Sequence, residues 1–333
     1  MFSRDIGIDL GTANVLIHVK GKGIVLDEPA IIALDRSTGK VLEVGEAAYR
    51  MVGRTPGNIK AIRPLKDGVI ADFDLTEAML RHFIDRIKVK GFFSKPRMLI
   101  CCPTNITKVE QKAIKQAAEK SGGKRVFLEE EPKVAAIGAG MEIYQPSGNM
   151  VIDIGGGTTD VAVLSMGNIV TAESIKMAGD KFDQAILQYI KDKHKLLIGE
   201  RTAEEIKINV ATVFKGSREE VMEFRGRDLI SGLPRTITVT SEEIEVALRD
   251  SVYEIVRAAK ATLERTPPEL SADIIDRGVI LTGGGALIHG IAQLLSEELK
   301  VPVFLAEDAK SAVATGTGIL LDNMGRRKAK SII

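Results

Sequence analysis

The sequence predicts a mixed α/β protein built from two similar domains. Two glycine-rich turns that begin with aspartate, residues 9–14 and 153–160, start 153 − 9 = 144 residues apart in a chain of 333 residues. Each turn follows one apolar, β-branched run and precedes another, which is the pattern of a strand, a tight turn and a second strand. Strand-like runs also alternate with helical patterns along the chain, as they do in layered α/β proteins. The chain is long enough for two domains with sizeable cores.

The first half is expected to begin as a strand meander and to continue with alternating helices and strands. Apolar residues recur at helical spacing between Leu75 and Ile87, and Thr107 and Glu110 have the spacing of a capping box. The expected strands are 4–10, 14–20, 23–27, 30–34, 97–102 and 125–129, and the expected helices are 75–89, one opened by Thr107, and 131–141.

The second half is expected to repeat this scheme. Thr202 and Glu205 also have capping-box spacing, and Pro267 is expected to stop a long helix. The polar stretch 216–240 is expected to form a small surface subdomain, and the small residues of 312–318 would allow a close helix crossing. The expected strands are 149–154, 160–165, 168–177, 277–281 and 302–305, and the expected helices are one from near Asp180, 202–213, 241–265, 286–299 and 309–321.

Composition argues against several classes of function. The formal net charge is +1, and aromatic residues make up 4% of the chain with no Trp, so we expect no nucleic-acid partner. Cys101 and Cys102 are neighbours in an apolar run, which predicts packed thiols rather than a disulfide, as in a cytoplasmic protein. The opening residues do not form a signal peptide, and no run of about 18 apolar residues is present, so we expect no membrane span.

The two aspartate turns predict a clamp for a polyphosphate between the domains. Their glycines let the backbone approach an anion closely, and Thr12, Asn14 and Thr158 add side-chain donors. Asp9 and Asp153 end the first strand of each turn, where a carboxylate suits a hydrated Mg²⁺. No P-loop and no G-x-G-x-x-G after a strand is present, so a dinucleotide fold is not expected.

Two further features fit a nucleotide site, although each also has a simpler interpretation. The loop Gly283-Gly284-Gly285-Ala286 follows an expected strand and could form a wall for the nucleoside, or it could be a plain strand–helix turn. Glu131 stands where a strand ends and a helix begins, with Pro132 in the first helical turn. Its carboxylate could orient a water toward a terminal phosphate, or it could only complement the helix dipole.

Taken together, these elements resemble those of the ATPase fold shared by actin, heat-shock chaperones and sugar kinases. The stretches 5–14, 62–72 and 266–270 look like the MreB family of bacterial actins, and residues 1–5 and 14–20 are most similar to its Mbl (MreB-like) branch. The resemblance implies an actin-like ATPase fold of duplicated ribonuclease-H-like domains with two small subdomains. Domain I would span 1–145, with a small subdomain at about 33–65 and the helix 309–325 returning to it. Domain II would span 146–308, with a small subdomain at about 181–244.

The same resemblance implies a role for each site residue, with ATP and Mg²⁺ as cofactors. Glu131 would orient the attacking water with help from Thr158, and Asp9 and Asp153 would hold Mg²⁺ through water. The residues that would bind the phosphates are Thr12, Ala13, Asn14, Gly156, Gly157 and Thr158. The residues that would form the two walls of the adenine site are Glu204, Glu205, Ile206 and Lys207 on one side and Gly284, Gly285, Ala286 and Leu287 on the other.

The resemblance also implies a membrane loop and a set of partners. Phe92 and Phe93 correspond to a hydrophobic insertion loop of the family, although adjacent phenylalanines also commonly pack onto their own domain. The implied function is an ATP-dependent, membrane-associated filament that determines rod cell shape by organising peptidoglycan elongation. Its partners would be further copies of the chain in paired polar protofilaments, the inner face of the cytoplasmic membrane, and cell-wall elongation proteins. A small-molecule kinase and a plasmid-segregation actin of the same fold remain alternatives.

Overall fold

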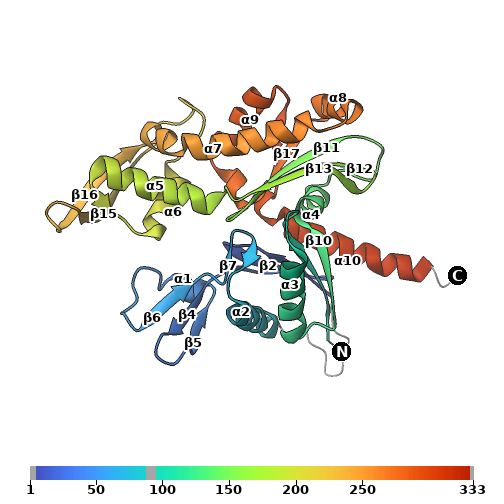
Figure 1. Cartoon of the computed structure of the whole chain (residues 1–333), viewed down its shortest axis with the longest axis horizontal. Helices are drawn as coiled ribbons and strands as arrows, with labels where there is room; N and C mark the ends of the chain where they lie inside the picture. Colours follow the sequence, from blue (N-terminus) through green and yellow to red (C-terminus); the bar gives the residue numbers. More distant parts are fainter. Residues whose placement is uncertain (1–4, 88–94, 331–333) are drawn as a thin grey trace.

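The computed structural model describes residues 5–87 and 95–330, and its first large sheet contains the first aspartate turn. The spatial order of its strands is β10-β9-β1-β2-β3 (Figure 1). The central strand β1 runs antiparallel to β2 and parallel to β9. The strands are β1 (Ile6–Leu10), β2 (Asn14–Val19), β3 (Gly23–Pro29), β9 (Arg97–Cys102) and β10 (Arg125–Glu130).

The second large sheet repeats the first in order and direction. Its strands follow the order β18-β17-β11-β12-β13, and β11 runs antiparallel to β12 and parallel to β17. The two halves therefore share one architecture, as the duplicated turns predict. The strands are β11 (Asn149–Ile154), β12 (Thr159–Ser165), β13 (Asn168–Ile175), β17 (Val279–Thr282) and β18 (Val303–Leu305).

Each large sheet is extended by a small one. In the chain, the strands of the sheet β5-β4-β6 lie between β3 and β9 of the first large sheet, and those of β14-β15-β16 lie between β13 and β17 of the second. A short hairpin pairs β7 with β8. In chain order these strands are β4 (Ile32–Asp35), β5 (Val41–Val44), β6 (Ile59–Ile62), β7 (Leu65–Lys66), β8 (Val69–Ile70), β14 (Leu196–Leu197), β15 (Val221–Asp228) and β16 (Pro234–Thr240).

The helices cover the faces of the sheets. The α-helices are α1 (Glu46–Tyr49), α2 (Phe73–Arg86), α3 (Lys108–Lys120), α4 (Glu131–Gly138), α5 (Gly179–His194), α6 (Glu200–Asn209), α7 (Ser241–Glu264), α8 (Pro268–Arg277), α9 (Ile291–Leu299) and α10 (Ala312–Lys330). Two short 3₁₀ helices, η1 (Gly284–Leu287) and η2 (Ala309–Ser311), precede α9 and α10. None of the helices in the described ranges is long and apolar enough to cross a membrane.

The α4 and α10 helices join the two halves at a close crossing. A Cβ atom added to Gly138 would lie 1.8 Å from the carbonyl oxygen of Ala312, and one added to Gly316 would lie 2.0 Å from that of Val134. The small residues of 312–318 are therefore explained by tight packing. A buried cluster around this crossing draws on both large sheets, through Leu99 of β9 and Val151 of β11.

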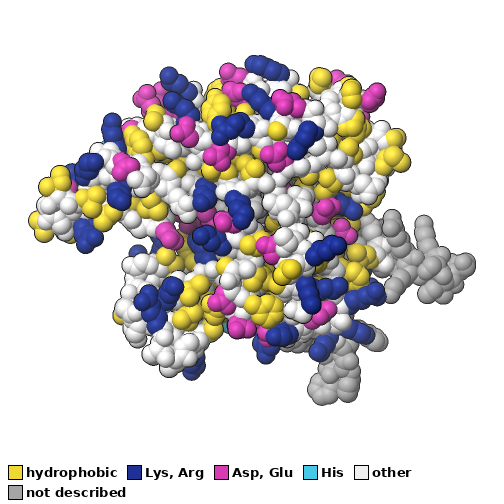
Figure 2. Space-filling model, in the orientation of Figure 1, with side chains coloured by type: hydrophobic (Ala, Val, Ile, Leu, Met, Phe, Trp, Pro, Cys, Tyr) yellow, Lys and Arg dark blue, Asp and Glu magenta, His cyan; other side chains and the backbone are white. Residues whose placement is uncertain are grey.

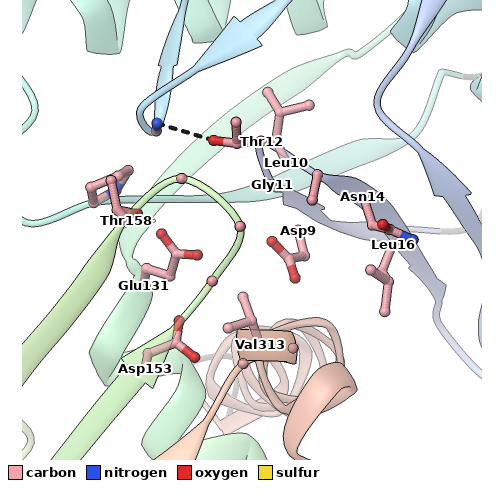
Figure 3. A pocket seen from close by; sticks show the side chains of 18 of the residues that line it. Asp9, Leu10, Gly11, Thr12, Asn14, Leu16, Glu131, Asp153, Thr158 and Val313 are labelled. Atoms are coloured by element: carbon pink, nitrogen blue, oxygen red, sulfur yellow. Dashed lines mark hydrogen bonds between the residues drawn. The ribbon is translucent and has the colours of Figure 1, made fainter. Parts of the chain in front are cut away.

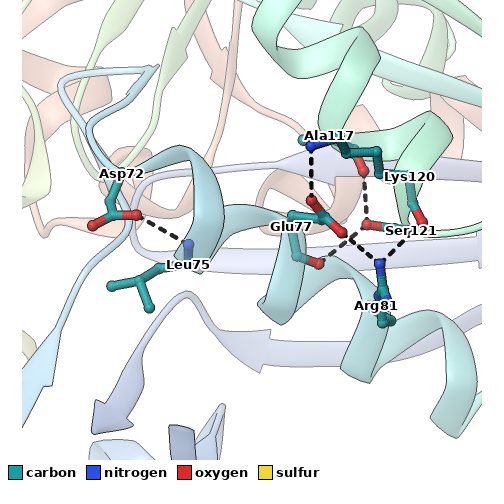
Figure 4. A network of polar contacts seen from close by, with 7 residues as sticks. All are labelled: Asp72, Leu75, Glu77, Arg81, Ala117, Lys120 and Ser121. Carbon is teal, nitrogen blue, oxygen red and sulfur yellow. Dashed lines mark hydrogen bonds and ion pairs between the residues drawn. The ribbon is translucent and has the colours of Figure 1, made fainter. Parts of the chain in front are cut away.

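The α2 and α3 helices pack side by side through polar contacts at one end (Figure 4). The Ser121 hydroxyl donates to the carbonyl of Glu77 at 3.1 Å, while the carboxylate of Glu77 pairs with Arg81 and with Lys120. The Asp72 side chain caps the N-terminus of α2. The α3 helix begins with the capping box predicted from Thr107 and Glu110.

Two local expectations from the sequence are wrong, and one helix was missed. The α6 helix begins at Glu200 with Gly199 as its N-cap, so Thr202 lies inside the first turn and forms no capping box. The stretch 286–299 is not one helix, because η1 ends at Leu287 and α9 begins only at Ile291, after Gly290 adopts φ +86°. The α8 helix, which follows directly after Pro267, was not expected.

Candidate functional site

The two aspartate turns meet in space. A Cβ atom on Gly156 would lie 2.5 Å from the Cβ of Ala13, and one on Gly157 would lie 2.5 Å from Oγ1 of Thr12. Only glycine allows this approach, because any larger residue would push the two turns apart. Between the turns lies a cavity of about 100 Å³. Its lining includes the predicted phosphate residues Thr12, Ala13, Asn14, Gly156, Gly157 and Thr158.

Three carboxylates point into this cavity (Figure 3). Asp9 and Asp153 lie in equivalent positions near the ends of β1 and β11, with exposed fractions of 9% and 3%. Glu131 is the first residue of α4. The three side chains therefore meet at one cavity, although Asp9 lies more than 120 residues before Glu131 and Asp153 in the chain.

These carboxylates hold their protons more tightly than usual. Burial raises the pKa of Asp9 to about 8, with further contributions from the charges of Asp153 and Asp27. Burial also raises the pKa of Asp153 to about 7, an effect that the Thr282 hydroxyl partly offsets by donating a hydrogen bond. The pKa of Glu131 is raised by burial and then by Asp153, Asp160 and Asp9. The cavity thus contains an excess of negative groups that a cation would offset.

The arrangement fits a hydrated Mg²⁺ better than a directly ligated metal. In residues 5–87 and 95–330, no three Asp, Glu, His or Cys side chains converge on one point as direct ligands. One oxygen of Asp153 already accepts a hydrogen bond from the Thr282 hydroxyl at 2.7 Å. Mg²⁺ keeps several of its waters and is commonly held by one or two carboxylates together with substrate phosphates. Asp9 and Asp153 meet that requirement.

A hairpin turn that the sequence analysis did not single out closes the cavity. The Gly68 amide donates a hydrogen bond to Oγ1 of Thr12 at 3.1 Å (Figure 3). A Cβ atom on Gly68 would lie 2.8 Å from Pro103 and 2.9 Å from the methyl group of Thr158. Asp67 and Gly68 both have positive φ, 51° and 77°. The Asp-Gly pair between two short strands is a strong hairpin signal that could have identified the turn.

A second cavity of about 490 Å³ adjoins the first and shares Ala13, Gly156 and Gly284 with it. This volume is within the range of small-molecule sites, roughly 300–1,000 Å³. Five of the eight residues predicted for the adenine site contribute to the walls. They are Glu204, Lys207, Gly284, Gly285 and Leu287, of which the last three belong to η1.

The remaining adenine-site predictions occupy different environments. Ile206 and Ala286 are buried in the hydrophobic core, with exposed fractions of 0% and 2%, and Glu205 is exposed on α6. None of these three lines the larger cavity. The α6 helix therefore presents Glu204 and Lys207 to the cavity, three residues apart on one face. Phe92 and Phe93 lie outside the described residues.

Lys310 is a further cation at the site that the sequence analysis missed. It follows the last large-sheet strand, in η2, and it lines both cavities. Its ammonium group pairs with Asp27, whose other carboxylate oxygen accepts a hydrogen bond from Asn14 at 2.7 Å. No local pattern marks this lysine, because its partner is 283 residues away in the chain.

Comparisons with known proteins agree on one family. The family model described as MreB/Mbl protein matches residues 3–329. The chain is 76% identical over 326 residues to the cell shape-determining protein Mbl of Bacillus subtilis (strain 168), covering 98% of each. It is 50% identical over 327 residues to the cell shape-determining protein MreB of Escherichia coli (strain K12), covering 97% of this chain and 94% of that relative. The crystal structure of MreB 5 of Spiroplasma citri bound to AMPPNP matches with a TM-score of 0.94 and 40% identity, covering 99% of both chains.

Proposed function

The chain belongs to the MreB/Mbl family, and from that premise we propose that it is a polymerising, actin-like ATPase of the bacterial cytoskeleton. The similar proteins Mbl and MreB are cell shape-determining proteins, and we assign the same role to this chain. Its filaments would lie in the cytoplasm at the inner face of the cell membrane. There they would organise peptidoglycan elongation together with cell-wall elongation proteins.

The observation that carries the proposal is the contact between the two glycine turns. Gly156 and Gly157 lie against Ala13 and Thr12, so backbone amides from both halves surround one small cavity. A polyphosphate in that cavity would be held by both halves at once. The larger cavity beside it has room for a nucleoside. ATP is the proposed nucleotide, because the solved relative with 40% identity binds AMPPNP, an ATP analogue.

The role of each residue follows from its place in the two cavities. Thr12, Asn14 and Thr158 would donate hydrogen bonds to the phosphates, and Glu204 and Lys207 would contact the nucleoside. Asp9 and Asp153 would hold Mg²⁺ through water, and the metal would neutralise charge on the phosphate oxygens. Glu131 would accept a proton from, or orient, the water that attacks the terminal phosphate.

Polymerisation is supported by exposed apolar side chains at opposite ends of the long axis. At one end, the tip of the β15–β16 hairpin carries Ile230 and Leu233, which are 85% and 66% exposed. At the other end, Met166 in the β12–β13 turn is 67% exposed. Figures 1 and 2 show the hairpin tip at the left and the turn at the right. Different surfaces at the two ends suit a head-to-tail contact, which propagates instead of closing.

The experiment that tests the function combines sedimentation with electron microscopy. Purified protein is incubated with ATP and Mg²⁺, with ADP, or with ATP and a panel of sugars, and phosphate release is measured in parallel. We expect ATP-dependent filaments and slow phosphate release that needs no acceptor. ATP consumption that requires a sugar, without filaments, would instead identify a kinase.

A lipid arm of the same experiment tests the membrane part. Phe92 and Phe93 are the proposed contacts, each with about 1.5–3 kcal/mol of apolar burial. Such weak anchors would act together along a filament. In a flotation gradient, we expect wild-type filaments to rise with liposomes and filaments of the Phe92→Ser/Phe93→Ser variant to stay at the bottom. Full flotation of the variant with liposomes would exclude these two residues as the anchor.

A further inference from the structure

One tyrosine connects the two lobes of the molecule beside the larger cavity. We call lobes the two halves that contain the first and the second large sheet. Tyr49 is the last residue of α1, and its hydroxyl donates a hydrogen bond to Oε2 of Glu204 in α6. The guanidinium of Arg201, also in α6, lies 5.3 Å from the centre of the Tyr49 ring. The two helices face each other at the left of Figure 1, although the bonded residues are 155 positions apart in the chain.

The Tyr49–Glu204 pair also forms a shared wall between two cavities. Both residues line the nucleoside-sized cavity of about 490 Å³ and the neighbouring cavity of about 190 Å³. Arg63, which follows β6, lines both cavities as well. Figure 2 shows the surface hollowed between the two lobes on this side of the molecule. A ligand in the larger cavity is therefore enclosed on one side by side chains from both lobes.

The hydrogen bond fixes one oxygen of Glu204 and leaves the other available. Within the described residues, Oε2 accepts from Tyr49 while Oε1 has no hydrogen-bond donor. A carboxylate oxygen can accept from hydroxyl and amino groups, the donors that the ribose and base of a nucleoside provide. Burial, together with the hydrogen bond to Glu204, raises the pKa of Tyr49 to about 12, so its hydroxyl keeps the proton it donates at neutral pH.

We propose that Tyr49 is a positioning residue of the nucleoside site, which holds the Glu204 carboxylate toward the donors of a bound nucleoside from the opposite lobe. The inference rests on the proposed function, because it places a nucleotide in the larger cavity. Its consequence is that nucleoside recognition and the contact between the lobes depend on the same hydrogen bond. Ligands without a nucleoside do not depend on it.

The test compares Tyr49→Phe with wild-type protein by calorimetric titration in the presence of Mg²⁺, at protein concentrations below those that polymerise. AMPPNP and inorganic tripolyphosphate are the two ligands. Tyr49→Phe removes only the hydroxyl and keeps the ring under Arg201. We expect the Kd for AMPPNP to rise about 5- to 10-fold, the typical net effect of losing one hydrogen bond. The Kd for tripolyphosphate should stay within about twofold, because its phosphates lie in the other cavity.

A matched control and a second variant make the outcome decisive. Tyr144→Phe removes a hydroxyl from a tyrosine that is 57% exposed and lines neither cavity, so both affinities should stay at the wild-type value. Glu204→Gln combined with Tyr49→Phe should weaken AMPPNP binding by less than the product of the single effects. If Tyr49→Phe weakens the binding of AMPPNP and of tripolyphosphate equally, or weakens neither, this inference is wrong while the proposed function stands. Wild-type protein that binds no nucleotide overturns the proposed function and this inference with it.

Discussion

At the scale of single residues, the site is organised around carboxylates whose environments differ sharply. Glu131 lies in the cavity beside Asp153, whereas Glu129, two residues earlier on β10, pairs with Lys133 at 3.6 Å near the surface. The sequence offered two interpretations for Glu131, water orientation and dipole complementation. Its position among Asp9, Asp153 and Thr158 favours the first (Figure 3).

Replacement of Glu131 by alanine should separate nucleotide binding from hydrolysis. We expect Glu131→Ala to bind ATP with a Kd within about threefold of wild type, because the phosphate donors remain. Phosphate release should fall by about 100-fold or more, which is typical for loss of a positioned base. Glu129→Ala is the matched control and should hydrolyse ATP at the wild-type rate. Normal phosphate release by Glu131→Ala would show that another group orients the water.

At the scale of elements, the two helices α6 and α7 show how a sequence signal can mislead. Thr202 and Glu205 have the spacing of a capping box, yet both lie inside α6. Thr240 and Glu243 have the same spacing and do form the box that opens α7. A Thr and a Glu three positions apart occur equally well inside a helix. Only the backbone conformation at the threonine decides whether it caps the N-terminus of the helix. Thr240 is extended, with φ −113° and ψ 160°, and so occupies the cap position.

These two threonines should respond differently to truncation. Thr240→Ala removes the acceptor for the Glu243 amide and should lower the free energy of unfolding by about 1 kcal/mol. Thr202→Ala should change it by less than about 0.5 kcal/mol, since alanine is a good residue inside a helix. Chemical denaturation of both variants without nucleotide provides the comparison. Equal losses would mean that Thr202 caps α6 in solution.

At the scale of the whole molecule, the two similar halves enclose one shared cavity between them. The two sheets have equivalent strand orders, and their central strands deliver Asp9 and Asp153 to the same cavity. The match to the MreB 5 structure, with a TM-score of 0.94, confirms the actin-like fold that the family resemblance implied. The expected domain boundaries, 1–145 and 146–308, remain predictions, although α10 does pack on β1 and β2 of the first sheet. Because the smaller cavity is lined by both halves, a polyphosphate bound there would contact both of them at once.

Polar substitution at one end should reduce polymerisation without affecting the site. We expect Ile230→Ser/Leu233→Ser to raise the critical concentration for filament formation about tenfold or more, because two apolar side chains lose their burial at the contact. AMPPNP affinity should be unchanged, since neither residue lines a nucleotide cavity. Val109→Ser is the control, an apolar residue 78% exposed on α3 away from both ends. Sedimentation over a range of protein concentrations measures the effect. Wild-type assembly by the double variant would place the contact elsewhere.

The sequence alone determined the elements whose information is local. The strands 97–102 and 149–154 match β9 and β11 at both ends, and the glycine turns match because their residues dictate backbone conformation. The meeting of Asp9 and Asp153 was also expected, since duplicated patterns fold alike and bring equivalent strand ends together. These features depend on periodicity and turn chemistry within about ten residues.

Only the tertiary structure decided the contacts between distant segments. The Gly68 amide on Thr12, the pairing of Lys310 with Asp27 and the bond from Tyr49 to Glu204 join residues 56, 283 and 155 positions apart. No local pattern distinguishes such a lysine or tyrosine from an ordinary surface residue. Their partners are selected when packed sheets and helices bring particular side chains within hydrogen-bonding distance. The glycine turns therefore could be found from the sequence, but these three contacts around the site could not.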